Sequence, residues 1–201
     1  MGRWEPGARG RLIDAAMALF STQGFAATSV PEIAERAGLT NRTFFRYFSD
    51  KREVLFAMES GFPERVSTVV SEMSPHSRPW DLIEQGLMIV ATAWFTEQRD
   101  FLKMRRAIIS SDASLRERDL IKQATLTSAV ESGFSALGFA PDQARLSAQL
   151  FSVILNDSVD SWLSTDVDSN LLEIMRLGLS TLRDLTSSAH PASTDGERFV
   201  S

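Results

Sequence analysis

A short stretch between residues 40 and 47 carries side chains that could contact DNA. Thr40, Asn41, Arg42, Thr43 and Arg46 supply hydroxyl, amide and guanidinium groups within this one segment. An arginine can donate two hydrogen bonds to a guanine edge, and an asparagine can pair in the same way with adenine. Hydroxyl and guanidinium groups also bind phosphate oxygens. This chemistry indicates a nucleic-acid contact, provided that the segment forms a protruding helix.

Side chains suited to catalysis or metal binding are few. The chain has no cysteine, and its two histidines, His76 and His190, fall in a proline-flanked loop and near the C-terminus. No carboxylate cluster has metal-ligand spacing, and no GxSxG, P-loop or GxGxxG motif occurs. We therefore expect neither an enzyme nor a bound cofactor or metal. Two alternatives stay open, namely a helical adaptor that binds protein in place of DNA and a helical enzyme that uses carboxylates alone.

The elements before the stretch are predicted to be two helices. Apolar residues at helical spacing predict one helix over about 9–23 and a second over about 30–37. Ser29, with Glu32 three residues later, makes a capping box that begins the second helix. The first two helices can thus brace whatever follows them.

The stretch itself is predicted to be a third helix, over about 41–48. Gly38 ends the preceding helix, and a tight turn leads into the third. Phe44 and Phe48 lie four residues apart, so one side of the third helix is expected to be buried and the other free. Two short helices joined by such a turn form a helix-turn-helix unit, whose second helix enters the DNA major groove.

The segment from Thr28 to Lys51, TSVPEIAERAGLTNRTFFRYFSDK, resembles the signature of the TetR family of repressors. The resemblance covers about residues 9–56. Two positions depart from the family pattern, since Phe44 stands where leucine is usual and Phe45 where tyrosine is usual. The missing hydroxyl at Phe45 would remove one phosphate hydrogen bond and leave a ring contact.

The resemblance implies a set of DNA contacts. Thr28 or Ser29 falls where the second helix meets a phosphate, and Lys51 falls at a phosphate-binding lysine. The variable, sequence-reading positions are Asn41, Arg42 and Arg46. The full expected set is Thr28, Ser29, Thr40, Asn41, Arg42, Thr43, Phe45, Arg46, Tyr47 and Lys51.

Charge is unevenly divided along the 201 residues. The net charge is −5, but residues 1–52 carry +3 and residues 53–201 carry −8. A mildly basic head on an acidic body suits contact with DNA at one end of the molecule. No apolar run approaches the roughly 18 residues of a membrane span, and the first residues lack the apolar stretch of a signal peptide. We expect a cytoplasmic protein without a membrane partner.

The rest of the chain is also predicted to be helical, which makes the fold class all-α with about nine helices. A long helix over about 51–73 is expected to join head to body, with Gly61 to Pro63 as a point where it could kink. Further helices are predicted over about 80–97, 101–110, 115–137, 141–164 and 169–187. The expected domains are a DNA-binding domain at 1–52, a ligand-binding and dimerisation domain at 53–187 and a flexible tail at 188–201.

By resemblance, the body would dimerise and bind a small-molecule effector. The last two helices would form the dimer interface, with Ala144, Ala148, Phe151, Leu155 and Trp162 as its apolar side, although the same residues would suit the body's own core. Candidate pocket residues are Trp94, Phe101, Met104, Arg105, Phe134, Phe151 and Trp162, although methionine and aromatic residues at helical spacing more often form a core than line a cavity.

The polar residues of the body leave the ligand open. The cluster of Lys103, Arg105 and Arg106 could meet an anionic ligand, but we expect it to face solvent. Asn156, Asp157 and Asp160 either line the pocket or face water. The body also faintly resembles regulators of acyl-CoA-like molecules. The expected function is that of a homodimeric repressor which binds an inverted-repeat, double-stranded DNA operator and is released by its effector.

Overall fold

The computed structural model describes residues 7–57, 60–95, 98–165 and 169–187, and every regular element within them is a helix. The all-α class is confirmed. The ten helices are α1 (Ala8–Gln23), α2 (Val30–Arg36), α3 (Asn41–Tyr47), α4 (Lys51–Leu55), α5 (Phe62–Ser71), α6 (Pro79–Trp94), α7 (Arg99–Ser111), α8 (Ala113–Ala136), α9 (Pro141–Ser164) and α10 (Leu171–Ser187). The tail predicted at 188–201 lies outside the described residues.

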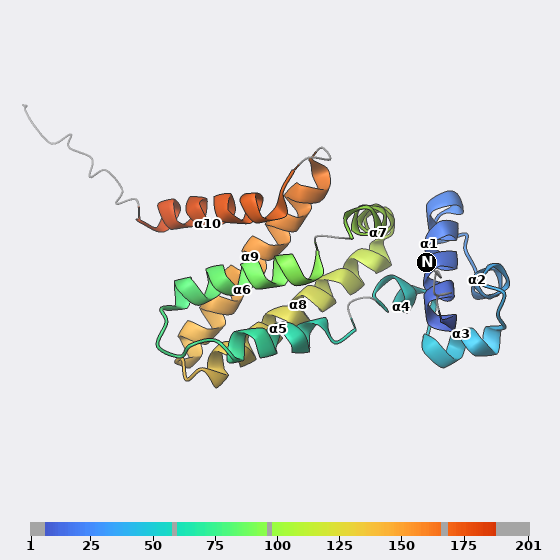
Figure 1. The fold of residues 1–201 in the computed structure, drawn as a ribbon. Coiled ribbons are helices and arrows are strands. Elements are labelled where there is room, and N and C mark those ends of the chain that lie inside the picture. Colours follow the sequence, from blue (N-terminus) through green and yellow to red (C-terminus); the bar gives the residue numbers. More distant parts are fainter. Residues whose placement is uncertain (1–6, 58–59, 96–97, 166–168, 188–201) are drawn as a thin grey trace, which may run out of the picture.

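The molecule divides visibly into a head, α1–α4, and a body, α5–α10 (Figure 1). In the body, α8 packs against both α5 and α9, and α10 packs against α9 and α6. Helix α7 contacts α1 of the head as well as α8 and α9 of the body. No helix in the described ranges is both long and apolar enough to cross a membrane. The division places the DNA-contact candidates at one end and leaves α7 between the two parts.

The capping residues begin the head's helices where the sequence predicts. Ser29 accepts a hydrogen bond from the Glu32 amide, and the Glu32 carboxylate accepts one from the Ser29 amide at 2.8 Å, which confirms the capping box. The same carboxylate also accepts from the Ser29 hydroxyl, which lowers the pKa of Glu32. Thr40 caps α3 by accepting from the Thr43 amide at 3.2 Å. These local bonds fix the register of α2 and α3.

The head is held together by a core that includes part of α7. Phe44 and Phe48 are buried, as predicted, with ring centroids 5.5 Å apart. Leu55 of α4 belongs to the same apolar cluster, and so do Ile108 and Ile109 of α7. The predicted domain boundary after residue 52 therefore falls inside α4, whose apolar residues pack in the head.

The prediction of a single helix over 51–73 is wrong. The structure has two helices there, α4 ending at Leu55 and α5 beginning at Phe62. Gly61 caps α5 with φ +71°, a left-handed conformation that glycine adopts without steric cost. Pro63 sits in the first turn of α5, where no backbone N–H is needed. The apolar pattern runs through both helices, so periodicity alone did not reveal the break.

Candidate nucleic-acid interface and body cavity

Helix α3 presents most of the predicted DNA contacts on one exposed surface. Asn41, Arg42, Phe45 and Arg46 are exposed, and Phe45 retains 58% of its accessible surface. Because Phe44 anchors the opposite side in the core, α3 cannot roll without breaking that packing. The exposed side of α3 is therefore a rigid and accessible polar surface.

One cationic and one aromatic side chain form a pair at the end of α3. Arg46 donates a hydrogen bond to the Tyr47 hydroxyl at 2.9 Å, and its guanidinium carbon lies 4.8 Å from the centre of the Tyr47 ring. Tyr47 is exposed as well. The pair holds the arginine along the helix surface, so a DNA contact by Arg46 would include or displace Tyr47.

Three of the predicted hydroxyl contacts, those of Thr28, Ser29 and Thr40, differ in accessibility, and Thr43 is partly exposed. Thr28 is only 2% exposed, and its hydroxyl donates to the Gly24 carbonyl at 2.8 Å. Ser29 and Thr40 are exposed, although both also serve as helix caps. Of the alternatives Thr28 and Ser29, the structure leaves Ser29 with the accessible side chain.

Lys51 has a structural role that the sequence did not indicate. Its ammonium group donates to the carbonyls of Phe25 and Thr28, both at 2.7 Å, and lies 4.4 Å from the centre of the Phe25 ring. These bonds tie the start of α4 to the loop between α1 and α2. Phosphate binding by Lys51 stays a prediction, since a phosphate would have to share the ammonium group with these carbonyls.

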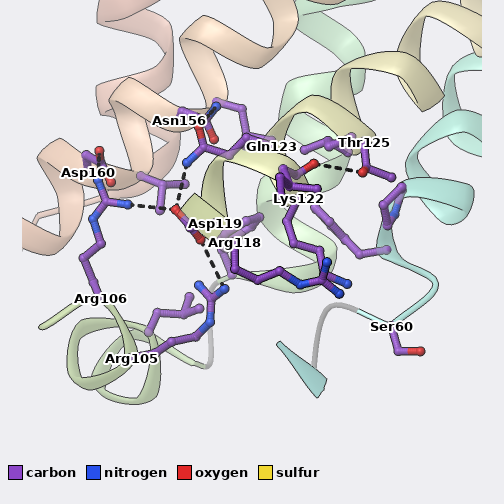
Figure 2. A pocket seen from close by; sticks show the side chains of 18 of the residues that line it. Ser60, Arg105, Arg106, Arg118, Asp119, Lys122, Gln123, Thr125, Asn156 and Asp160 are labelled. Atoms are coloured by element: carbon purple, nitrogen blue, oxygen red, sulfur yellow. Dashed lines mark hydrogen bonds and ion pairs between the residues drawn. The ribbon is translucent and has the colours of Figure 1, made fainter. Parts of the chain in front are cut away.

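A cavity of about 380 Å³ lies in the body between α5, α7, α8 and α9. One part of its wall is polar and carries Arg105, Arg106, Asp119, Gln123 and Asn156, most of which converge in Figure 2. The apolar part consists of Phe62, Phe95, Leu102, Ile121, Leu126, Leu155, Val159 and Leu163. The cavity thus combines an apolar wall with a charged end.

The pocket residues predicted from the sequence are mostly elsewhere. Only Arg105 lines the cavity, while Trp94 and Phe101 line a smaller adjoining hollow of about 90 Å³ together with Arg105. Met104 is exposed. Phe134, Phe151 and Trp162 are buried in the body's core. These last three side chains fill the core instead of lining the cavity, because large apolar side chains stabilise most when fully packed.

The charged end of the cavity is one continuous network (Figure 2). The Asp119 carboxylate lies 3.5 Å from a nitrogen of Arg105 and 3.5 Å from a nitrogen of Arg106. It also accepts a hydrogen bond from the Gln123 amide at 2.9 Å. Arg106 reaches further to Asp160. Burial raises the pKa of the Asp160 carboxyl above its usual value, although Arg106 acts in the opposite direction.

This network shows that the prediction of a solvent-facing basic cluster is wrong for Arg105 and right for Lys103. Lys103 is exposed, but Arg105 is only 9% exposed and Arg106 lines the cavity. Asn156 and Asp160 also line the cavity, whereas Asp157 is exposed. The carboxylate of Asp119 on α8 stabilises both the buried Arg105 and the partly exposed Arg106. Sequence reasoning missed Asp119 because it lies in a polar segment of α8, with no local sign that it faces inward.

The residues predicted for the dimer interface are also misplaced. Ala144, Ala148, Phe151, Leu155 and Trp162 are all buried in the core of their own chain, so they are not available to a second copy. The exposed apolar side chains of the last two helices are Leu146 and Val153 on α9 and Leu177 and Leu185 on α10. The alternative that the five residues form the body's own core is the correct one.

The sequence of the head matches a known family. Residues 12–58 match the sequence model described as "Bacterial regulatory proteins, tetR family". This match covers the helix-turn-helix unit together with α4. The fatty acid metabolism regulator protein of Bacillus subtilis (strain 168) is 22% identical over 192 residues, which span 90% of this chain and 94% of that protein.

Solved structures share the whole fold. One is a TetR-family regulator from Syntrophomonas wolfei, with a TM-score of 0.63 and 16% identity over 92% of this chain and 98% of that chain. Another is Thermus thermophilus FadR, a TetR-family transcriptional repressor in complex with lauroyl-CoA. It has a TM-score of 0.53 and 21% identity over 94% of this chain and 100% of that chain. The capped helix-turn-helix, the exposed α3 and the match over residues 12–58 thus give this chain a head that is similar to the DNA-binding head of tetR-family regulators, on a fold that it shares with them.

Proposed function

We propose that the protein is a ligand-responsive repressor that binds an inverted-repeat operator as a dimer through α3. The observation that carries the proposal is the geometry of α3. Phe44 and Phe48 fix the helix from within, while Asn41, Arg42 and Arg46 face outward. A major groove about 12 Å wide admits a helix held in this way.

The dimer is supported by the exposed apolar side chains of α9 and α10. Leu146 and Val153 are seven residues apart, and Leu177 and Leu185 are eight apart, so each pair shares one side of its helix. We propose this surface, the α9–α10 apolar surface, as the two-fold interface. A two-fold dimer presents two copies of α3, which requires two half-sites in inverted orientation.

The effector is proposed to be an amphipathic anion that resembles acyl-CoA. The cavity has an apolar wall, and its charged lining consists of Arg105, Arg106, Arg118 and Lys122 together with Glu64, Asp119 and Asp160. An acyl chain fits an apolar wall, and a phosphate or thioester end fits arginines. The relative from B. subtilis and the lauroyl-CoA complex of the T. thermophilus protein support the same chemistry.

The DNA side of the proposal is tested on the DNA that flanks the protein's own gene. Fluorescence anisotropy is expected to show tight binding that weakens steeply with salt. Arg42→Ala and Arg46→Ala should each alter the preference among operator variants and cost about 1–3 kcal/mol on the preferred one. Arg145→Ala, an exposed arginine on α9, is the matched control and should bind as the unaltered protein does.

Two outcomes would contradict this assignment. An equal loss on every sequence in both arginine variants would mean that neither contacts a base. Binding to the flanking DNA no tighter than to random DNA would favour the adaptor or the enzyme.

The effector side is tested by titrating lauroyl-CoA into the protein–operator complex. We expect release of DNA with lauroyl-CoA, and little release with free CoA, which has no acyl chain for the apolar wall. Because a ligand shifts an equilibrium only by its differential affinity for the two states, partial release would measure that difference. If neither lauroyl-CoA nor laurate releases DNA from the complex, the effector does not belong to the acyl-CoA-like class.

A further inference from the structure

Arg105 connects the wall of the cavity to the last turn of α4. Its Nε donates to the Leu55 carbonyl at 2.8 Å, and its guanidinium carbon lies 5.0 Å from the centre of the Phe56 ring. Leu55 ends α4, so its carbonyl is among those that the short helix cannot satisfy internally. Leu55 and Phe56 both belong to the core of the head. The guanidinium therefore holds the end of the head from within the body.

The other side of the same guanidinium faces Asp119. The nearest approach is 3.5 Å, between Nη2 of Arg105 and Oδ1 of Asp119, which is longer than a strong charge-assisted hydrogen bond. The two side chains are only 10% and 12% exposed. Of these two contacts of Arg105, the one with the Leu55 carbonyl is therefore the shorter, and the one with Asp119 is the longer.

Asp119 is held away from Arg105 by groups that line the cavity. Its Oδ2 accepts from Gln123 at 2.9 Å and lies 3.5 Å from Arg106. Arg106 is itself paired with Asp160. An anionic group in the cavity would compete with both aspartates for Arg106. A buried carboxylate that loses one cation is strongly drawn to the remaining one, since an unpaired buried charge is costly.

We propose that Arg105 is the positioning residue through which an occupied cavity loosens the head. When an anion takes Arg106, Asp119 draws Arg105 toward itself and away from the Leu55 carbonyl. Helix α4 then loses this anchor and keeps the ion pair between Glu53 and Arg118 of α8, so the spacing of the two heads is less tightly fixed for the operator. The inference rests on the proposed effector site, but the anchoring of α4 can be measured without any ligand.

The experiment compares two substitutions with opposite expected effects. Arg105→Met removes the donor to Leu55, so operator binding without ligand should weaken about tenfold, within the range usual for coupling between two sites. Asp119→Asn removes the charge that draws Arg105 away, so operator binding should be retained. Lauroyl-CoA should then bind Asp119→Asn but release its DNA about tenfold less effectively than from the unaltered protein. The double variant should behave as Arg105→Met does.

Controls separate this role from a loss of folding. Lys103→Met removes an exposed cation from the same helix and should match the unaltered protein. Arg105→Lys can still donate to the Leu55 carbonyl, so it should restore most operator affinity. Thermal unfolding of every variant is recorded alongside, and a folded Arg105→Met protein with weak operator binding is the expected result.

Failure of the inference and failure of the effector class give different results. If Arg105→Met binds operator within twofold of the unaltered protein, or if Arg105→Lys is as weak as Arg105→Met, Arg105 does not anchor the head. If lauroyl-CoA releases DNA from Asp119→Asn as it does from the unaltered protein, the transfer through Asp119 is refuted. If lauroyl-CoA does not bind the unaltered protein, the effector is not an acyl-CoA. The operator affinities of Arg105→Met and Arg105→Lys still test whether Arg105 anchors α4.

Discussion

Leu177→Glu is expected to turn the proposed dimer into a monomer and to abolish detectable operator binding. Leu177 lies on α10 and is 68% exposed in the single chain, on the α9–α10 apolar surface. In a two-fold interface the substitution places two carboxylates in the apolar contact, where charge is poorly tolerated. Losing the linkage between two heads removes roughly 10²–10⁴-fold of the apparent affinity for a two-site operator.

The measurement is light scattering on a sizing column, followed by anisotropy on the operator. Leu120→Glu is the matched control, because Leu120 is 63% exposed but lies on α8 and is not part of the α9–α10 apolar surface. It should remain dimeric and bind DNA normally. A dimeric Leu177→Glu protein, or a monomeric Leu120→Glu protein, would move the interface away from α9 and α10.

Phe44→Ala is expected to lower the free energy of unfolding by about 3–5 kcal/mol, as truncation of a fully buried phenylalanine usually does. Phe44 is completely buried against Phe48 and the other apolar residues of the head. Removing its ring opens a void under α3, so the helix loses the packing that fixes its exposed side. Operator binding should therefore be lost, while the α9–α10 apolar surface lies outside the affected core and dimerisation should persist.

Phe45→Ala makes a matched comparison, since it removes the same ring from the next residue. Phe45 is largely exposed, so the free energy of unfolding should change by no more than about 0.5 kcal/mol. Operator affinity should nevertheless fall if the ring contacts DNA. Chemical denaturation of both variants, with operator anisotropy, separates the two roles. Equal losses of stability would contradict the inward and outward assignment of the two rings.

The errors in the predicted dimer interface have a common physical cause. Helix α9 has apolar or small residues on more than one side, and both a core and an interface are built from such residues. Periodicity places Phe151 and Val153 on different sides of α9, but it does not say which side meets the same chain. The first is buried in the body, and the second is exposed. Only the packing of α9 against α8 and α10 decides between them.

The sequence by itself determined the all-helical class, the helix-turn-helix and the inward pair of Phe44 and Phe48. Caps and i, i+4 pairs act over a few residues, so their consequences can be read locally. Which groups surround the cavity, and which carbonyls and carboxylates the buried cations bind, depends on the tertiary structure. Arg105 meets Leu55 across 50 positions in the chain, and Lys51 meets Phe25 across 26. Such contacts depend on how helices pack, because no short-range pattern specifies which distant carbonyl or carboxylate a buried cation will meet.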